Sequence, residues 1–127
     1  MRNLAVLTLI AQQRATSTVT GSDVDLGNYA NVGGREMKAV LAIDSAGTDT
    51  DETCDVKLQE AATTVSSDFA DISGATFTQY TQESAAAVEE IHFRAQSRYI
   101  RAVATLAGTT PAFDLALIVM AKERHAA

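Results

Sequence analysis

The chain has 127 residues, a formal net charge of −6 and a single cysteine, Cys54. Hydrophobic residues make up 46% of it and charged residues 20%, which excludes a disordered chain and fits one domain over residues 1–127. The acidic balance argues against nucleic-acid binding, a lone cysteine excludes an internal disulfide, and no apolar run reaches the roughly 18 residues of a membrane helix.

The first apolar run, residues 4–11, predicts a strand that is covered on both faces, because apolar side chains occupy both alternating positions. Arg2 and this run resemble the start of a secretory signal. Residues 12–14, however, are Gln, Gln and Arg where a cleavage site needs small residues. We expect residues 1–3 to form an N-terminal arm that reaches a neighbouring molecule.

The middle of the chain contains four runs that alternate apolar and polar residues, as half-buried strands do. These runs are residues 37–44, 56–60, 91–94 and 99–106. Turn signals rich in Gly, Ser and Asp separate them at short intervals, which is typical of an all-β sandwich or barrel. Residues 82–90 contain three alanines between glutamates and suit either a helical turn or a loop before the strand that follows.

The last apolar run, residues 113–121, is apolar on both faces like the first. One face of such a strand meets the core of the sandwich, and the other needs a cover, either a loop or a neighbouring subunit. The sequence does not decide which face is which. Our candidate interface residues in these two runs are Leu4, Val6, Ala116, Ile118 and Met120.

No catalytic, cofactor or metal site is predicted. Neither His92 nor His125 lies in a metal-binding or catalytic pattern, and Cys54 has no paired cysteine. Gly33 and Gly34 lack the spacing of a phosphate-binding loop. The acidic stretch of residues 44–55 is the one place with the density of a ligand set. It remains open between a solvated hairpin loop and a Ca²⁺ loop.

Six segments follow one another in an order that resembles small virion proteins from the head gene clusters of tailed phages. The resemblance extends over about residues 19–122. The segments are residues 24–29 (VDLGNY), 48–55 (TDTDETCD), 56–60 (VKLQE), 67–75 (SDFADISGA), 97–103 (SRYIRAV) and 108–111 (GTTP). Residues 61–65 (AATTV) depart from the tighter, more polar turn of such proteins.

The resemblance implies an antiparallel β-sandwich of jelly-roll type without catalytic activity. It implies a capsid decoration or cement protein, made in the host bacterial cytoplasm and placed on the outer surface of the virion. Its partners would be the major capsid protein and further copies of itself, as a homotrimer. A head-fibre base, a head-completion protein or another tail-associated protein would share much of the pattern. Arg98 and Arg101 are expected either to brace the sheet or an inter-subunit contact, or to lie exposed on its wet face.

A carbohydrate-binding module is the main rival function, because jelly-roll sandwiches commonly hold sugars. Such a module needs a line of exposed aromatic side chains. The sequence has no Trp, and its tyrosines are Tyr29, Tyr80 and Tyr99.

Overall fold

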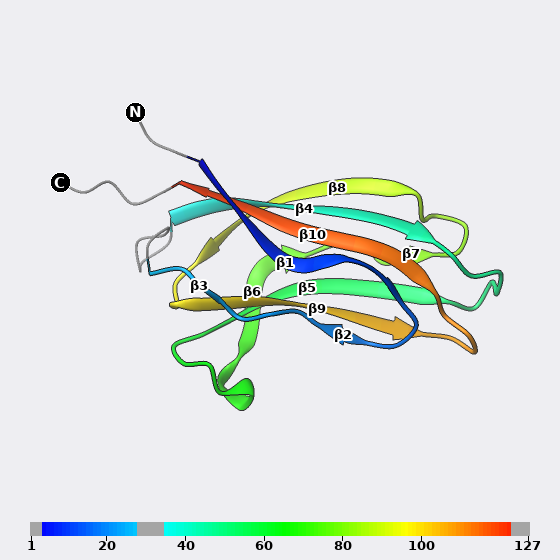
Figure 1. Cartoon of the computed structure of the whole chain (residues 1–127), viewed down its shortest axis with the longest axis horizontal. Helices are drawn as coiled ribbons and strands as arrows, with labels where there is room; N and C mark the ends of the chain where they lie inside the picture. Colours follow the sequence, from blue (N-terminus) through cyan, green and yellow to red (C-terminus); the bar gives the residue numbers. More distant parts are fainter. Residues whose placement is uncertain (1–3, 28–34, 123–127) are drawn as a thin grey trace.

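The computed structural model describes residues 4–27 and 35–122, which form strands and one short 3-10 helix, Ser66–Asp68 (Figure 1). Residues 1–3, Gly33 and Gly34 lie outside the described residues. The strands are β1 (Leu4–Ala15), β2 (Val19–Thr20), β3 (Val24–Asp25), β4 (Arg35–Ser45), β5 (Thr53–Ala61), β6 (Ala70–Thr76), β7 (Tyr80–Thr81), β8 (Ala87–Ala95), β9 (Tyr99–Ala107) and β10 (Phe113–Lys122).

The strands form two antiparallel sheets. The first sheet has the order β1-β10-β4-β8 and is uppermost in Figure 1. The second has the order β2-β9-β5-β6, with β3 also paired to β9 and β7 to β5. The pairs β1·β10, β2·β9, β4·β8 and β5·β6 are nested like one long hairpin folded over itself. This is the jelly-roll arrangement, so the predicted fold class is confirmed.

The core lies between the sheets and is built mainly from aliphatic residues. The alternating run 37–44 sends Met37, Ala39, Leu41 and Ile43 into it, each at most 4% exposed. The last apolar run turns Phe113, Leu115, Leu117 and Val119 inward, each at most 1% exposed. Tertiary structure thus decides which face of that run is core, and Ala116, Ile118 and Met120 face outward, half-buried.

A close approach at Gly21 ties the β2–β3 segment to both sheets. Its N–H donates to the Ala102 carbonyl of β9 at 2.8 Å. A Cβ built at Gly21 would lie 2.0 Å from the Leu9 carbonyl oxygen of β1. Only glycine leaves room for this contact, which draws β1 toward the second sheet.

Residues 82–90 form no helix, although their composition equally suits a helical turn. The chain makes a turn through Ala86, whose φ of 83° is unusual for a residue other than glycine, and then enters β8. The Ala86 N–H donates to the Ile43 carbonyl of β4 at 3.1 Å. Pairing with β4 therefore overrides the helical propensity of the alanines. Within residues 4–27 and 35–122, no helix is long and apolar enough to span a membrane.

Candidate interaction surface

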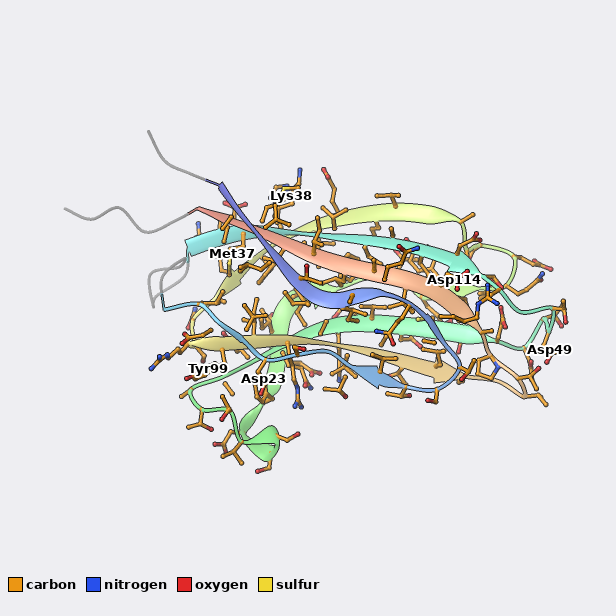
Figure 2. The ribbon with its side chains drawn as sticks, in the orientation of Figure 1. Asp23, Met37, Lys38, Asp49, Tyr99 and Asp114 are labelled. Carbon is orange, nitrogen blue, oxygen red and sulfur yellow. The ribbon has the colours of Figure 1, made fainter. Side chains whose placement is uncertain are left out.

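The outer side of the first sheet carries a patch of apolar side chains, which we call the apolar face. Cross-strand partners share a side of a sheet, so the register of β1, β10, β4 and β8 fixes its membership. Its apolar residues are Val6, Val40, Ala42, Val88, Ala116, Ile118 and Met120. In Figure 2, Lys38 projects away from the sandwich on this side, while Met37 lies toward the core.

The apolar face is not covered by the described part of the chain. Val88 is 74% exposed and Val6 is 59% exposed. The third large hydrophobic side chain that is exposed in the described residues, Val65 at 56%, lies apart in the β5–β6 loop. A covering loop, one of the two explanations for the apolar runs, is therefore not formed by these residues. The side chain of Leu4, a further candidate interface residue, lies outside the described set.

Small residues leave a depression in the apolar face. It measures about 610 Å³, and Ala42, Ala87, Val88 and Ala116 lie in its wall. Polar side chains, among them Gln12, Asp44 and Asp114, complete its rim. The larger side chains of the same strands, Ile118 and Met120, lie to one side of this depression. The face is thus uneven, with a hollow at one end and bulk at the other.

Two ion pairs lie around the apolar face. Arg14 holds Asp114 at 2.9 Å, Lys38 holds Glu90 at 3.2 Å, and His92 lies 3.6 Å from Glu36. The hydrogen bond from Arg14 keeps the pKa of Asp114 below its ordinary value. Among the side chains that the structure describes, three cations and four carboxylates lie on this side of the sheet, a net charge of −1. They are Arg14, Lys38 and Arg94, and Glu36, Asp44, Glu90 and Asp114.

The outer side of the second sheet is polar, and Arg101 makes several of its side-chain contacts. The guanidinium of Arg101 donates to Gln59 Oε1 at 2.9 Å and to Ser66 Oγ at 3.0 Å. It also lies 4.1 Å from the centre of the Phe69 ring. Arg101 therefore braces β9, β5 and the β5–β6 loop of its own subunit, which is one of the two roles that we expected for it.

Arg98 makes a comparable contact just before β9 begins. It holds Asp25 of β3 through two hydrogen bonds of 3.0 and 2.8 Å, and it lies 5.2 Å from the centre of the Tyr99 ring. The hydrogen bond from Arg98, with a second from the Gly27 N–H, lowers the pKa of Asp25. Arg98 braces the sheet, and no observation tests an inter-subunit role for either arginine.

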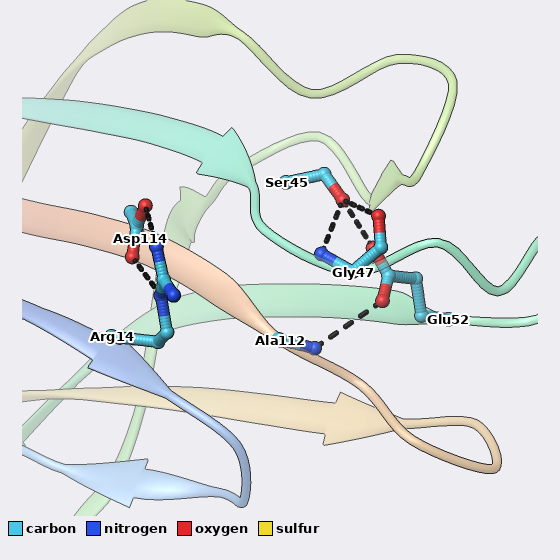
Figure 3. A network of polar contacts seen from close by, with 6 residues as sticks. All are labelled: Arg14, Ser45, Gly47, Glu52, Ala112 and Asp114. Carbon is cyan, nitrogen blue, oxygen red and sulfur yellow. Dashed lines mark hydrogen bonds and ion pairs between the residues drawn. The ribbon is translucent and has the colours of Figure 1, made fainter.

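The acidic stretch of residues 44–55 is used to fasten two loops together (Figure 3). Glu52 is fully buried and accepts hydrogen bonds from the Ser45 hydroxyl and, at 3.2 Å, from the Ala112 N–H. A Cβ at Gly47 would lie 2.1 Å from a carboxylate oxygen of Glu52, so glycine makes room for this carboxylate. Sequence reasoning missed this network, because a Glu among aspartates is ordinarily solvated.

Neighbouring carboxylates of this stretch point to the β9–β10 turn. Asp51 accepts from the N–H and the hydroxyl of Thr109 at 3.1 and 2.7 Å, and Asp49 accepts from the Thr110 hydroxyl. Asp49 and Asp51 thus each accept from a threonine of that turn. In residues 4–27 and 35–122, no three His, Cys, Asp or Glu side chains are grouped as metal ligands. Asp49 and Asp51 therefore act as acceptors that hold the β9–β10 turn.

The reactive side chains considered from the sequence are not brought together. His92 is exposed on the apolar side of β8, where its Nδ1 lies 3.6 Å from a carboxylate oxygen of Glu36. Cys54 is buried in the core, and desolvation, with the nearby charge of Asp55, raises the pKa of its thiol to about 12. A thiol of that pKa is not a nucleophile near neutral pH. His125 lies outside the described residues.

The aromatic side chains do not form a sugar-binding platform in the described residues. Tyr80 is 7% exposed, and its hydroxyl donates to Glu89 at 2.6 Å. Tyr99 is half-buried beside Arg98, and Phe69 lies against Arg101. Tyr29 lies outside the described residues. This arrangement does not favour the carbohydrate-binding rival.

No protein-family model and no curated protein sequence matches the chain. Two of the solved structures that match the chain cover almost all of it. The SPBc2 prophage-derived protein YomS is 12% identical with a TM-score of 0.59, over 97% of this chain and 96% of that one. The structure of infectious bursal disease virus, Gx strain, contains a chain that is 8% identical with a TM-score of 0.55, over 96% of this chain but 32% of that one. What they share with this chain is the fold.

Proposed function

We propose that the protein is a structural component of a phage particle, a decoration or cement protein that binds the outer surface of the assembled head and bridges its capsomers. Its partner would be the major capsid protein. Support comes from the jelly roll that it shares, over almost its full length, with a prophage-derived protein and with a chain of a virus structure. Fold alone does not determine function, so the proposal also rests on the exposed surface of the first sheet.

The apolar face is the observation that carries this proposal. Exposed apolar patches with a polar rim mark sites where a protein meets another macromolecule. The outer side of the second sheet, in contrast, carries polar side chains such as Arg101, which donates to Gln59, and Lys57, which holds Asp71 at 3.0 Å. A protein with one exposed apolar face is suited to bind flat against the surface of a larger assembly such as a phage head.

The loops of the sandwich are fastened in a way that suits a bridging subunit. Glu52 joins the β4–β5 loop to the start of β10, and Arg101 joins the β5–β6 loop to β9. A preordered surface loses less conformational entropy when it binds than a flexible one does. A subunit that binds the assembled shell but not its separated parts stabilises the shell by mass action, and no catalytic group is required.

The test uses heads assembled from the candidate major capsid protein in the absence of this chain. We expect saturable binding of the purified protein to these heads, and a higher melting temperature of the heads measured by calorimetry. Unassembled capsid protein and the heads of an unrelated phage are the controls, and neither should bind. Equal binding to unassembled subunits, or no binding to heads, would refute the cement role. Labelled antibodies in electron microscopy would then look for it at a head fibre, the head-completion site or the tail.

A further inference from the structure

We propose that the depression in the apolar face receives a lysine side chain of the surface that this face covers, and that Asp44 is the carboxylate that pairs with its ammonium group. The inference rests on the proposed function and adds to it the chemistry of the partner at this site. It also gives a role to a charged residue that the fold itself does not use. In residues 4–27 and 35–122, no hydrogen bond or ion pair reaches the exposed Asp44 carboxylate.

The position of Asp44 in the sheet leaves one negative charge without compensation. Asp44 lies directly opposite Asp114 on the outer side of the first sheet. Opposed side chains are about 5 Å apart at Cβ, and two like charges in such a pair destabilise a sheet. Arg14 of β1 compensates Asp114 at 2.9 Å (Figure 3). Its own strand is two strands away from β4, about 9.6 Å at the usual spacing, so Asp44 has no cation of its own.

The other carboxylates around the apolar face each have a basic group close by. Lys38 holds Glu90 at 3.2 Å, and the Nδ1 atom of His92 lies 3.6 Å from Glu36. A macromolecule that covers the face removes these groups from water, and a carboxylate that loses water without gaining a cation or hydrogen bonds costs free energy. A surface that binds over Asp44 must therefore bring a positive charge to it.

The surroundings of Asp44 suit the stem of a lysine. Two residues further along the sheet, about 6.8 Å away, Ala116, Ala42 and Val88 lie side by side on β10, β4 and β8. They belong to the wall of the depression of about 610 Å³, and Asp44 and its neighbours form the polar rim. The four methylene groups of a lysine pack on apolar side chains of this kind while the ammonium group stays at a polar edge.

The two carboxylates favour an ammonium group over a guanidinium. Asp114 already accepts two hydrogen bonds from the guanidinium of Arg14, at 2.9 and 3.2 Å. A second planar fork therefore has only Asp44 to bind, whereas an ammonium group has three donors that rotate and can contact both carboxylates. A positive charge between the two carboxylates also offsets the repulsion between them.

The test compares the binding of Asp44→Asn and Asp23→Asn to the heads used for the proposed function. Asp23 is the matched control, because it is also exposed and lies between β2 and β3, on the side of the second sheet (Figure 2). Asp44→Asn should raise the dissociation constant at least about tenfold and make it less dependent on salt. Asp23→Asn, with the same change of charge, should alter it less than about twofold. The free Asp44→Asn protein should melt at or above the native temperature, because its repulsion with Asp114 is gone.

Acetylation of the surface lysines of the heads identifies the partner group, since it removes their charge. The native protein and Asp44→Asn should bind acetylated heads with equal dissociation constants. A tenfold difference that persists on acetylated heads would overturn the assignment to lysine. Equal binding of the two proteins to untreated heads would overturn the inference and leave the proposed function standing. A native protein that does not bind heads would refute the proposed function, and the lysine site with it.

Discussion

Replacing Glu52 tests whether its hydrogen bonds stabilise the end of the sandwich where the β4–β5 loop meets the start of β10. This carboxylate is fully buried, and it joins Ser45 of β4 to Ala112 at the start of β10. Glu52→Ala leaves the Ala112 N–H without its acceptor, and leaves the Ser45 hydroxyl with only the longer contact to the Gly47 carbonyl at 3.4 Å. Hydrogen bonds to a carboxylate contribute about 1.5–3 kcal/mol each, so the free energy of unfolding should fall by about 1.5–6 kcal/mol, the range from one lost bond to two. Glu52→Gln keeps an acceptor oxygen and should cost about 1–2 kcal/mol.

Gly47 provides the second arm of a double-mutant cycle. The three atoms nearest to a Cβ at Gly47 all belong to Glu52, the closest at 2.1 Å. Gly47→Ala should therefore cost about 1–3 kcal/mol in the native chain through overpacking. In the Glu52→Ala background the obstacle is gone, and the same change should cost less than about 0.5 kcal/mol.

Urea unfolding of the four proteins, followed by circular dichroism, measures the cycle. Glu83→Ala, at an exposed position in the turn before β8, is the control and should change stability by less than about 0.5 kcal/mol. Additive costs at positions 47 and 52, or a Glu52→Ala variant as stable as the native protein, would refute the network as the element that holds this end.

Three further predictions concern the burial of Cys54, the response of stability to acid, and the close approach at Gly21. Cys54, with its pKa raised to about 12, should react with a thiol reagent at pH 8 only as fast as the protein unfolds, and rapid labelling of the folded protein would contradict its burial. The pKa of Asp25 is lowered in the folded state, so the unfolded chain binds more protons as pH falls below the ordinary value of 3.8. Stability from its contact with Arg98 is therefore present above that pH and lost in more acidic solution. In urea unfolding at several pH values, the free energy of unfolding of Asp25→Asn should fall less steeply with decreasing pH than that of the native protein. An equal pH dependence of the two proteins would count against the contact. Gly21→Ala places a Cβ against the Leu9 carbonyl and should destabilise by about 1–3 kcal/mol or more in the same assay, whereas a neutral result would mean that β1 can move away.

The sequence by itself determined the fold class and most of the strand faces. Alternation over residues 37–44 and 99–106 places the correct side chains in the core, since a strand sends successive residues to opposite sides. It also identified Ala116, Ile118 and Met120 as residues that need an explanation beyond an ordinary wet face.

Tertiary structure decided what local patterns leave open. Residues 113–121 have two apolar faces, and only the position of β10 between β1 and β4 shows which one meets the second sheet. Residues 82–90 extend into a strand because β4 offers an unpaired edge, which composition does not reveal. Glu52 is buried because Ser45 and Ala112 converge on it from segments up to 60 residues away in the chain. A carboxylate enters a core only where such donors meet it, and that meeting is a property of the folded chain.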